Sequence, residues 1–467
     1  MKKFTAIVIL ITAIMLFDTG FAQRNAPFVI SGTWERRGNP TEIVLYQVIS
    51  GRLERVSVAL LQSDQSFAMA FVPQTEGFFV VGTGSPNMRA DKYTFYMKPG
   101  DQLNIAVNDT SYTLVGENTL ENIAIKAWHD FIQPLEWHSF YFARATPPSL
   151  TYVDFFPLLQ ERLDNPFVAP RTRNRVFDAA FATYRKFDLI HCALNFAMTP
   201  RSVHPQDEDF PDFYRTLNVK NFDNTDILIF PYRLLPTILH FQNRFSEENL
   251  IGDNPNVALM NMLTNDTLKG EVFLTGILSA IRELPRMQEA NTKFAKYVVT
   301  DDQKRRFNQE IERVNRLHLE QGIGNPGLDW TFKDVNGNDV SFSDFRGKVV
   351  YVDVWATWCS PCRAEIPHKK KVKEHFAGND NIVFVGISTD APRDIQRWRD
   401  FVASNELTGY QLHGNIDGPG NISRLYNITG IPRFLLFDKR GNIVSIDAPR
   451  PSSAEIIPLL TRLVQQR

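Results

Sequence analysis

Residues 352–363 read VDVWATWCSPCR, and this stretch decides the fold of the C-terminal part of the chain. The segment from Lys348 to Val354 predicts a buried strand, and an aromatic turn then leads into a helix that opens at Cys359. Two cysteines separated by two residues at a helix start can close a small disulfide ring. Cys359 would also lie where unpaired backbone N–H groups and the helix dipole stabilise a thiolate, the form that attacks disulfides. The pattern indicates a redox centre.

A CxxC pair also occurs as half of a zinc site, so the other metal-binding residues decide between the two. The chain has three Cys and nine His, and neither a second CxxC nor a His pair lies at ligand spacing. The sequence therefore favours redox chemistry and predicts no metal site and no cofactor. Cys192, in an apolar helical segment, is interpreted as a buried small hydrophobe, with a third redox thiol as the alternative.

The surroundings of the motif resemble a known family. WCxPC after a VDVWA strand is similar to the thioredoxin superfamily. The lead-in segments Asn325–Leu328, Asp334–Gly337 and Ser341–Lys348 resemble its TlpA/ResA-like branch of extracytoplasmic thiol-disulfide oxidoreductases. The resemblance covers Asn325 to Arg467. Strands that alternate with helices there predict an α/β thioredoxin-like domain, with a mixed sheet covered by helices on both faces.

The resemblance also implies roles for individual residues. Cys359 would be the nucleophile, as the cysteine of the pair that is usually exposed, and Cys362 would resolve the mixed disulfide by attacking Cys359. Pro432 corresponds to the cis-proline that faces the CxxC, and it would present the backbone of Ile431 to an extended substrate segment. Trp358 is expected to shield the sulfurs and to offer an apolar contact surface to the substrate.

Two carboxylates are candidate proton carriers. Asp353 precedes the motif at the position of thioredoxin's buried acid, and burial would raise its pKa and let it accept the Cys362 proton through a water. Glu365 matches an active-site glutamate of the ResA branch. The alternatives are an exposed Asp at the strand end and a first-turn Glu favoured by the helix dipole. Which carboxylate is the main base stays open.

Charge and composition limit the partners. The formal net charge of −1 and the pI near 6.8 give no reason to expect nucleic acid or an acidic membrane surface. The run Lys369–Lys371 is interpreted as a solvated helix face, with a basic docking patch as the alternative.

The first 22 residues predict a signal peptide. A short basic start is followed by an apolar run from Phe4 to Phe17, and small residues suit cleavage before Gln23. An uncleaved anchor is the alternative, although the apolar run is short for a bilayer. We therefore expect export to the periplasm and no stable membrane insertion after cleavage.

Three domains are expected after the signal peptide. Short strands with turn residues predict an antiparallel β-sandwich-like domain over residues 26–117. Helical periodicity predicts an α-helical domain over residues 118–322, although Pro231 and Pro236 interrupt one of its segments. The thioredoxin-like domain would cover residues 325–467, after a Gly-rich linker.

Together these features predict a periplasmic thiol-disulfide oxidoreductase that uses a CxxC dithiol. The resemblance favours reduction of disulfides in envelope proteins, with electrons from a membrane-embedded thiol donor and a role in cytochrome c maturation. One alternative is a disulfide-forming oxidant, because the same chemistry runs either way according to its potential. Another is an envelope binding protein in which the redox site is subsidiary.

Overall fold

The computed structural model describes residues 26–35, 40–141, 151–199, 203–415 and 420–466. The described chain divides into two compact units, one ending at Val272 and the other beginning at Phe273. The predicted signal peptide, residues 1–22, lies outside the described residues. In the part of the chain that is described, no helix is long and apolar enough to cross a membrane.

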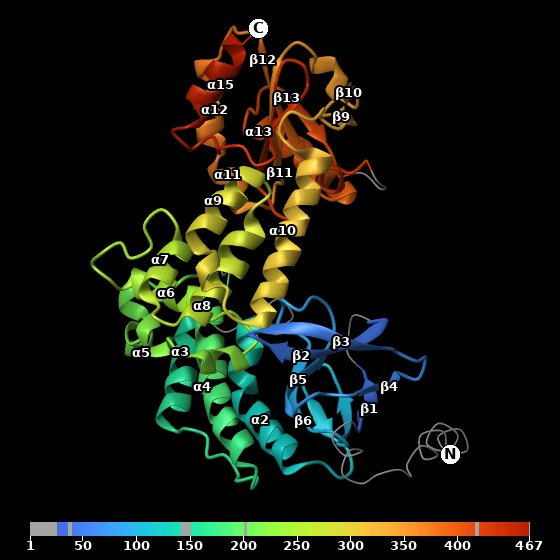
Figure 1. The fold of residues 1–467 in the computed structure, drawn as a ribbon, viewed down its shortest axis with the longest axis vertical. Helices are drawn as coiled ribbons and strands as arrows, with labels where there is room; N and C mark the ends of the chain where they lie inside the picture. The colour runs from blue at the N-terminus through green and yellow to red at the C-terminus, as the bar shows by residue number, and fades with distance from the viewer. Residues whose placement is uncertain (1–25, 36–39, 142–150, 200–202, 416–419, 467) are drawn as a thin grey trace. The chain divides into compact units, whose positions relative to one another are not determined.

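The first unit begins with two four-stranded sheets (Figure 1). In spatial order, the first sheet consists of β4 (Ser66–Phe71), β1 (Phe28–Trp34), β7 (Gln102–Val107) and β8 (Tyr112–Leu114). The second consists of β3 (Arg52–Leu60), β2 (Glu42–Ile49), β5 (Gly77–Gly82) and β6 (Lys92–Met97).

Both sheets contribute to one core, which makes this region the predicted sandwich. In β7, buried Leu103, Ile105 and Val107 alternate with more exposed residues, as expected for a strand with one face in the core. Among the described residues of these two sheets, all the strand pairs are antiparallel except β1 with β7, which is parallel. These two strands are far apart in the sequence, so no hairpin turn forces them to run in opposite directions.

Helices complete the first unit. They are α2 (Leu120–Phe140), α3 (Tyr152–Asp164), α4 (Arg175–Met198), α5 (Asp212–Arg215), α6 (Leu235–Arg244), α7 (Pro255–Met262) and α8 (Asp266–Val272), with 3-10 turns η3 (Asp207–Asp209), η4 (Val219–Phe222) and η5 (Thr225–Ile229). The side chains of Thr119 and Asn174 cap the first turns of α2 and α4. Helix α2 packs against both β6 and α4. The segment with Pro231 and Pro236 is interrupted, as predicted, and only its second part is the helix α6.

The second unit opens with helical segments. They are η6, a π-turn (Phe273–Ile277), η7 (Leu278–Ala280), α9 (Leu284–Phe294), η8 (Ala295–Tyr297) and α10 (Asp301–Gln321). The segment from Leu268 to Leu284, despite its helical periodicity, is therefore not one continuous helix. Thr275 and Gly276 lie where the regular helix is lost, and both residue types have low helix propensity. In α10, Thr300 and Gln303 form a capping box.

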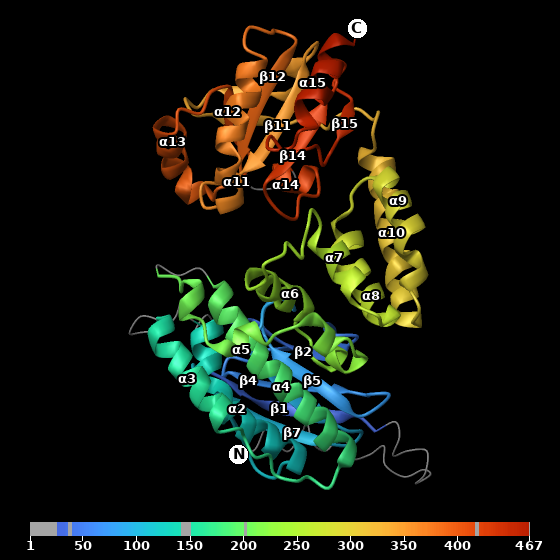
Figure 2. The same cartoon turned by 90° about the vertical axis from the view of Figure 1, so that its left-hand side faces the viewer.

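A seven-stranded mixed sheet forms the centre of the second unit (Figure 2). In spatial order its strands are β10 (Asp339–Ser341), β9 (Thr331–Asp334), β13 (Tyr410–His413), β12 (Ile382–Ser388), β11 (Val349–Trp355), β14 (Arg433–Phe437) and β15 (Ile443–Ser445). Strand β11 is fully buried between β12, to which it is parallel, and β14, to which it is antiparallel. The short strands β9, β10 and β13 were not predicted.

Helices cover both faces of this sheet. They are α11 (Ser360–Ala364), α12 (Ile366–His375), α13 (Ile395–Ser404), α14 (Ile422–Leu425) and α15 (Ile456–Gln465), with 3-10 turns η9 (Phe342–Phe345) and η10 (Pro392–Asp394). Alternate residues of β11 enter two different cores: Val349 and Tyr351 pack with α12 and α15, and Val350 and Val352 pack with η9 and α14. This is the predicted thioredoxin-like arrangement.

The segment from Cys359 to Phe376 forms two helices. Helix α11 ends at Ala364 and α12 begins at Ile366, with Glu365 between them. Pro367 has no N–H to donate to the carbonyl four residues earlier, which explains the break.

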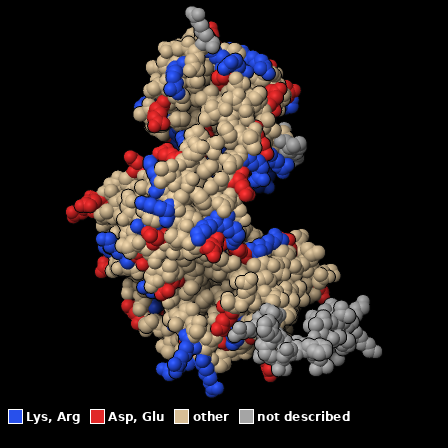
Figure 3. All heavy atoms as spheres, viewed as in Figure 1, with Lys and Arg blue, Asp and Glu red and all other residues tan. Residues whose placement is uncertain are grey.

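On the face shown in Figure 3, basic and acidic side chains are interspersed, in keeping with the net charge of −1.

Candidate active site

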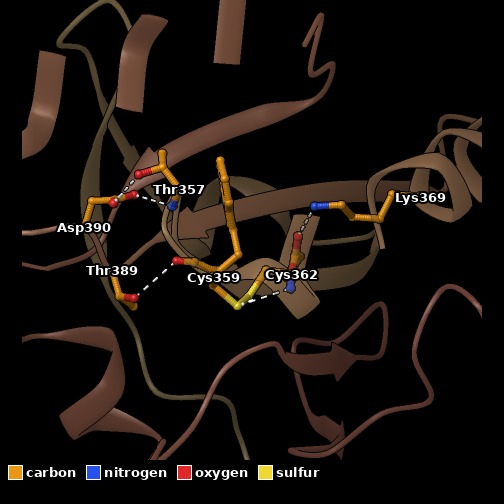
Figure 4. The surroundings of a disulfide bond; sticks show 8 residues. Thr357, Cys359, Cys362, Lys369, Thr389 and Asp390 are labelled. Atoms are coloured by element: carbon orange, nitrogen blue, oxygen red, sulfur yellow. Dashed lines mark hydrogen bonds and ion pairs between the residues drawn. A yellow bond between two sulfur atoms is a disulfide. The ribbon is translucent and has the colours of Figure 1, made fainter. Parts of the chain in front are cut away.

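Cys359 and Cys362 form a disulfide where β11 leads into α11 (Figure 4). Cys359 is the N-cap of α11, and its Sγ accepts a hydrogen bond of 3.2 Å from the backbone N–H of Cys362. Pro361 occupies the first helical turn, where an N–H is not needed. The same N–H group would stabilise a thiolate on Cys359 after reduction, because it points at the sulfur.

The two cysteines are more enclosed than expected. Cys359 is 4% exposed and Cys362 is 1% exposed. Cys359 is therefore the more exposed of the two, as predicted, but its exposed surface is much smaller than expected for a nucleophile. The cause is packing, because both cysteines share an apolar cluster with the buried Trp355 and Trp398. Trp358, in contrast, is 63% exposed and offers apolar surface beside the motif.

Asp353 lies on β11, six residues before Cys359, and its residue is 6% exposed. Its Oδ2 forms an ion pair with Nζ of Lys369 on α12. Burial raises the pKa of Asp353 above its ordinary value, and the Lys369 ammonium opposes that rise. The alternative of an exposed Asp at the strand end is therefore wrong, and the predicted raised pKa has the expected cause.

The burial of Lys369 corrects the interpretation of Lys369–Lys371 as a solvated helix face. Its side chain is 15% exposed and contacts a buried carboxylate, so it is not part of a solvated face. Lys370 and Lys371 are exposed. Helical spacing explains the difference, because Lys369 falls on the same side of the helix as the buried Ile366 and Val372.

Glu365 lies at the junction of α11 and α12 and is 6% exposed. One carboxylate oxygen accepts a hydrogen bond from the backbone N–H of Ser452, and the other accepts one from its hydroxyl, at 3.0 and 2.8 Å. The sequence did not predict this pairing, which spans 87 positions along the chain. A proton-carrying role for Glu365 stays a prediction.

A buried polar network anchors the turn that precedes Cys359, and sequence reasoning missed it. The fully buried Asp390 accepts hydrogen bonds from the backbone N–H and the hydroxyl of Thr357, at 2.9 and 2.6 Å. Thr389 donates both its N–H and its hydroxyl to the Trp355 carbonyl, at 2.8 and 3.2 Å. Both residues follow β12, which is parallel to β11, and the carboxyl ends of parallel strands meet at one edge of a sheet. The sequence Ser388-Thr389-Asp390 at the end of β12 was the signal that could have revealed them.

The Ile431–Pro432 peptide bond is cis, as predicted. Ile431 packs against the apolar cluster that contains both cysteines, so this loop lies beside the disulfide. The loop thus has the position expected for a substrate-binding backbone, and that role stays a prediction.

Cys192 lies in α4 of the other unit and is fully buried. Burial raises the pKa of its thiol well above the ordinary value, as expected for a small hydrophobe in a core. Among the described residues, no group of three His, Cys, Asp or Glu side chains is arranged to hold a metal ion.

Comparisons with known proteins identify relatives of the second unit. The family model described as Redoxin matches residues 323–455. Thioredoxin-like protein YneN of Bacillus subtilis is 33% identical over 123 residues, which cover 26% of this chain and 69% of that protein. Thiol-disulfide oxidoreductase ResA of Bacillus thuringiensis is 26% identical over 124 residues, which cover 26% of this chain and 67% of that protein.

Among solved structures, the thioredoxin domain of a thiol-disulfide oxidoreductase from Bacteroides vulgatus is 28% identical to this chain. The match covers 31% of this chain and 98% of that domain, with a TM-score of 0.27. With the matched relatives, the fold and the CxxC disulfide define the class: the chain belongs to the TlpA/ResA-like branch of the thioredoxin superfamily. It is a thiol-disulfide oxidoreductase.

Proposed function

We propose that this oxidoreductase is exported to the periplasm and reduces disulfides in envelope proteins. The observation that carries the redox role is the Cys359–Cys362 disulfide at the start of α11, with a backbone N–H directed at the first sulfur. Support for export comes from the predicted signal peptide over residues 1–22, and support for the reducing direction comes from the family resemblance.

The cycle follows from the order of the two cysteines. The Cys359 thiolate attacks one sulfur of the partner's disulfide, forms a mixed disulfide and releases the partner's other sulfur as a thiolate. Cys362 then loses its proton and attacks Cys359 Sγ. This step releases the partner with both sulfurs reduced and forms the intramolecular disulfide seen in the structure. A membrane-embedded thiol donor returns two electrons and two protons to the pair.

The surface beside the disulfide suits an extended polypeptide partner. Trp358 exposes 63% of its surface there, and the Ile431–Pro432 loop packs against the cluster around the sulfurs. A partner strand that pairs with the backbone of Ile431 would bring its disulfide to Cys359. Because the two cysteines are nearly buried, the partner has to reach the edge of Cys359 that is solvent-accessible.

The test combines activity with trapping. Full-length protein should reduce insulin with dithiothreitol as electron source, and Cys359→Ser should abolish that activity. Cys362→Ser should instead accumulate a mixed disulfide with its partner, because the resolving thiol is missing. Equal inactivity of the wild type and both variants would contradict the proposal.

The reduction potential decides the direction of electron flow. A value near the roughly −270 mV of thioredoxin identifies a reductant, whereas a value near the roughly −120 mV of DsbA identifies an oxidant. Equilibration of the full-length protein with dithiothreitol or glutathione buffers measures it. Fractionation of cells that express the full chain, with and without residues 1–22, tests export.

A further inference from the structure

The helices α9 and α10 are held against the thioredoxin-like domain, although they precede the part of the chain that the Redoxin family matches. The Ser445 hydroxyl on β15 donates to the Glu283 carboxylate, which directly precedes α9. At the other end of the pair, the Gln321 amide of α10 donates to the Leu425 carbonyl of α14 at 2.6 Å. Side chains of this helical pair therefore border the thioredoxin-like domain within the second unit.

Arg282, in the turn before α9, contacts the loop that carries the cis peptide bond. Its Nη2 donates to the Thr429 hydroxyl at 3.0 Å. Thr429 lies two residues before Ile431, whose backbone is proposed to pair with a partner strand. Thr429 and Gly430 are exposed, and Arg282 is half-buried. The guanidinium of Arg282 therefore borders the surface on which the partner would lie.

The guanidinium of Arg282 is held in place by neutral acceptors. Its Nη1 donates to the carbonyls of Ser279 and Ile281, at 2.6 and 3.1 Å. Arg313 on α10 donates to the same Ile281 carbonyl at 2.8 Å, which fixes the turn that carries Arg282. Because the guanidinium is already oriented, a partner group that binds it costs little further side-chain entropy.

The two carboxylates whose charges act on Arg282 are paired with other arginines. Glu310 forms an ion pair with Arg313 at 2.7 Å, and Asp447 forms one with Arg433. Within the described parts of the chain, no carboxylate forms an ion pair with Arg282 itself. Burial and the charges of Arg313 and Arg433 lower the pKa of Arg282, because they disfavour its charged form. The site therefore lacks one negative charge next to the loop.

We infer that Arg282 is a specificity-determining residue, which binds a carboxylate side chain of the partner protein beside the disulfide that is exchanged. A strand paired with Ile431 also passes Thr429, so the carboxylate belongs to an Asp or Glu about two residues from the pairing position. The charge-assisted hydrogen bond would offset the repulsion between Arg282 and its neighbouring arginines. The inference rests on the proposed dithiol exchange and deepens it, because it names acidic extended segments as the class of partner.

The test is the rate at which the reduced full-length protein exchanges with three peptides that carry one cysteine as a thiopyridyl mixed disulfide. The peptides differ only in having Glu, Gln or Lys two positions away on both sides of that cysteine. Cys359 attacks the peptide sulfur and releases thiopyridone, whose absorbance gives the rate. The Glu peptide should react at least ~5-fold faster than the Lys peptide at low salt. In about 1 M salt, where charges are screened within about 3 Å, the ratio should fall towards one.

Substitutions assign this preference to Arg282. Arg282→Met should bring the Glu-to-Lys ratio close to one at low salt, and Arg282→Lys should retain only part of the preference, because lysine keeps the charge but not the planar fork. Arg440→Met is the matched control and should keep the wild-type ratio. It removes the same charge from a side chain that is 85% exposed, beyond the end of β14 opposite to Arg433. If Arg282→Met does not fold, Arg282→Gln removes the charge with a polar side chain.

Two outcomes would overturn the inference. One is equal rates for the Glu and Lys peptides in the wild type, and the other is an undiminished ratio in the folded Arg282 variants. Thiopyridyl exchange requires only a reactive Cys359 and does not depend on the direction of electron flow. A preference for the Glu peptide that depends on Arg282, in a protein that does not reduce insulin, would therefore contradict the proposed function and support the role of Arg282.

Discussion

The two units of this protein both bury carboxylates beside a cation, but they treat the charge in different ways. In the first unit, Arg89 lies between Glu136 and Asp188, with all three side chains less than 10% exposed. His129 lies 3.5 Å from the second oxygen of Glu136, and the Trp128 indole donates to the second oxygen of Asp188. Every carboxylate oxygen in this cluster therefore faces a donor or a cation.

In the second unit, Asp353 has only Lys369 on one oxygen and no donor from the described residues on the other. As a result, the pKa values of Glu136 and Asp353 are shifted in opposite directions from their ordinary values. Burial alone would raise the pKa of Glu136, but Arg89 and His129 lower it to about 2. Burial prevails at Asp353 and raises its pKa. Because both clusters adjoin a cavity of about 30 Å³, the difference comes from the number of donors and not from the available space.

Cys192 and Cys359 also differ in how far their surroundings favour the charged form. Cys192 is fully buried in α4, where burial raises the pKa of its thiol well above the ordinary value. Cys359 has a backbone N–H pointing at its sulfur and a small exposed edge. Donors and cations beside Glu136 and beside the sulfur of Cys359 favour the charged form, whereas burial prevails at Asp353 and Cys192 and disfavours it.

The largest expected effect concerns thiol reactivity. In the reduced protein at pH 7, Cys359 should react with iodoacetamide at least ~10²-fold faster than Cys192. The thiolate is the reactive form, a backbone N–H stabilises it at Cys359, and burial disfavours it at Cys192. Mass spectrometry of tryptic peptides after short exposures measures both rates at once. Urea should make Cys192 reactive. Similar rates for the two cysteines in the folded protein would remove the contrast.

The next effect concerns stability of the first unit. Arg89→Met leaves Glu136 and Asp188 buried without their shared cation, and it should lower the free energy of unfolding by about 3–5 kcal/mol. Urea unfolding followed by tryptophan fluorescence measures the change. Arg55→Met removes an ion pair with Glu42 in which both side chains are more than 40% exposed, and it should have no measurable effect. Equal effects of the two substitutions would show that Arg89 contributes no more than a surface charge.

The smallest effect is the dependence of stability on pH, which should have opposite signs at the two carboxyls. Glu136 has a folded pKa of about 2 against 4.5 for an ordinary Glu. Its stabilisation, about 3 kcal/mol, is present above pH 4.5 and is lost as the pH falls towards 2. Asp353 has a folded pKa above its ordinary 3.8, so it favours the folded state below pH 3.8, and this contribution is lost as the pH rises through the folded pKa.

Two substitutions separate these contributions. Glu136→Gln should destabilise the protein at pH 7 and have little effect near pH 2. Asp353→Asn should shift the free energy of unfolding more favourably at pH 8 than at pH 4, because only the ionised form of the buried carboxylate is disfavoured by burial. Urea unfolding at each pH gives the four values. A gain from Asp353→Asn that is equal at pH 4 and pH 8 would mean that its charge is not the cause.

The sequence alone predicted the features that depend on local pattern. The strand before Cys359, the helix start at the motif and the buried Asp353 follow from residues that are neighbours in the chain, and the resemblance added the cis peptide at Pro432. The three short strands β9, β10 and β13 were missed because each has only three or four residues, too few for a clear alternation.

Contacts between distant segments were not predictable in this way. Glu365 pairs with Ser452, and Thr357 pairs with Asp390, and nothing in the local sequence names either partner. Lys369 is a different case, because its helical spacing from Cys362 and Ile366 already placed it on the buried side. The run of three lysines was interpreted from its composition, whereas its helical periodicity indicates correctly that Lys369 lies on the buried side of the helix.

The anchoring of Thr357 on Asp390 has a consequence for varying this enzyme. The turn that delivers Cys359 is held from β12, and the two residues between the cysteines, Ser360 and Pro361, are exposed. Replacement of that dipeptide should therefore leave the supporting scaffold in place. The chain is a suitable host for a library of CxxC loops in which changes of redox behaviour are separated from changes of fold.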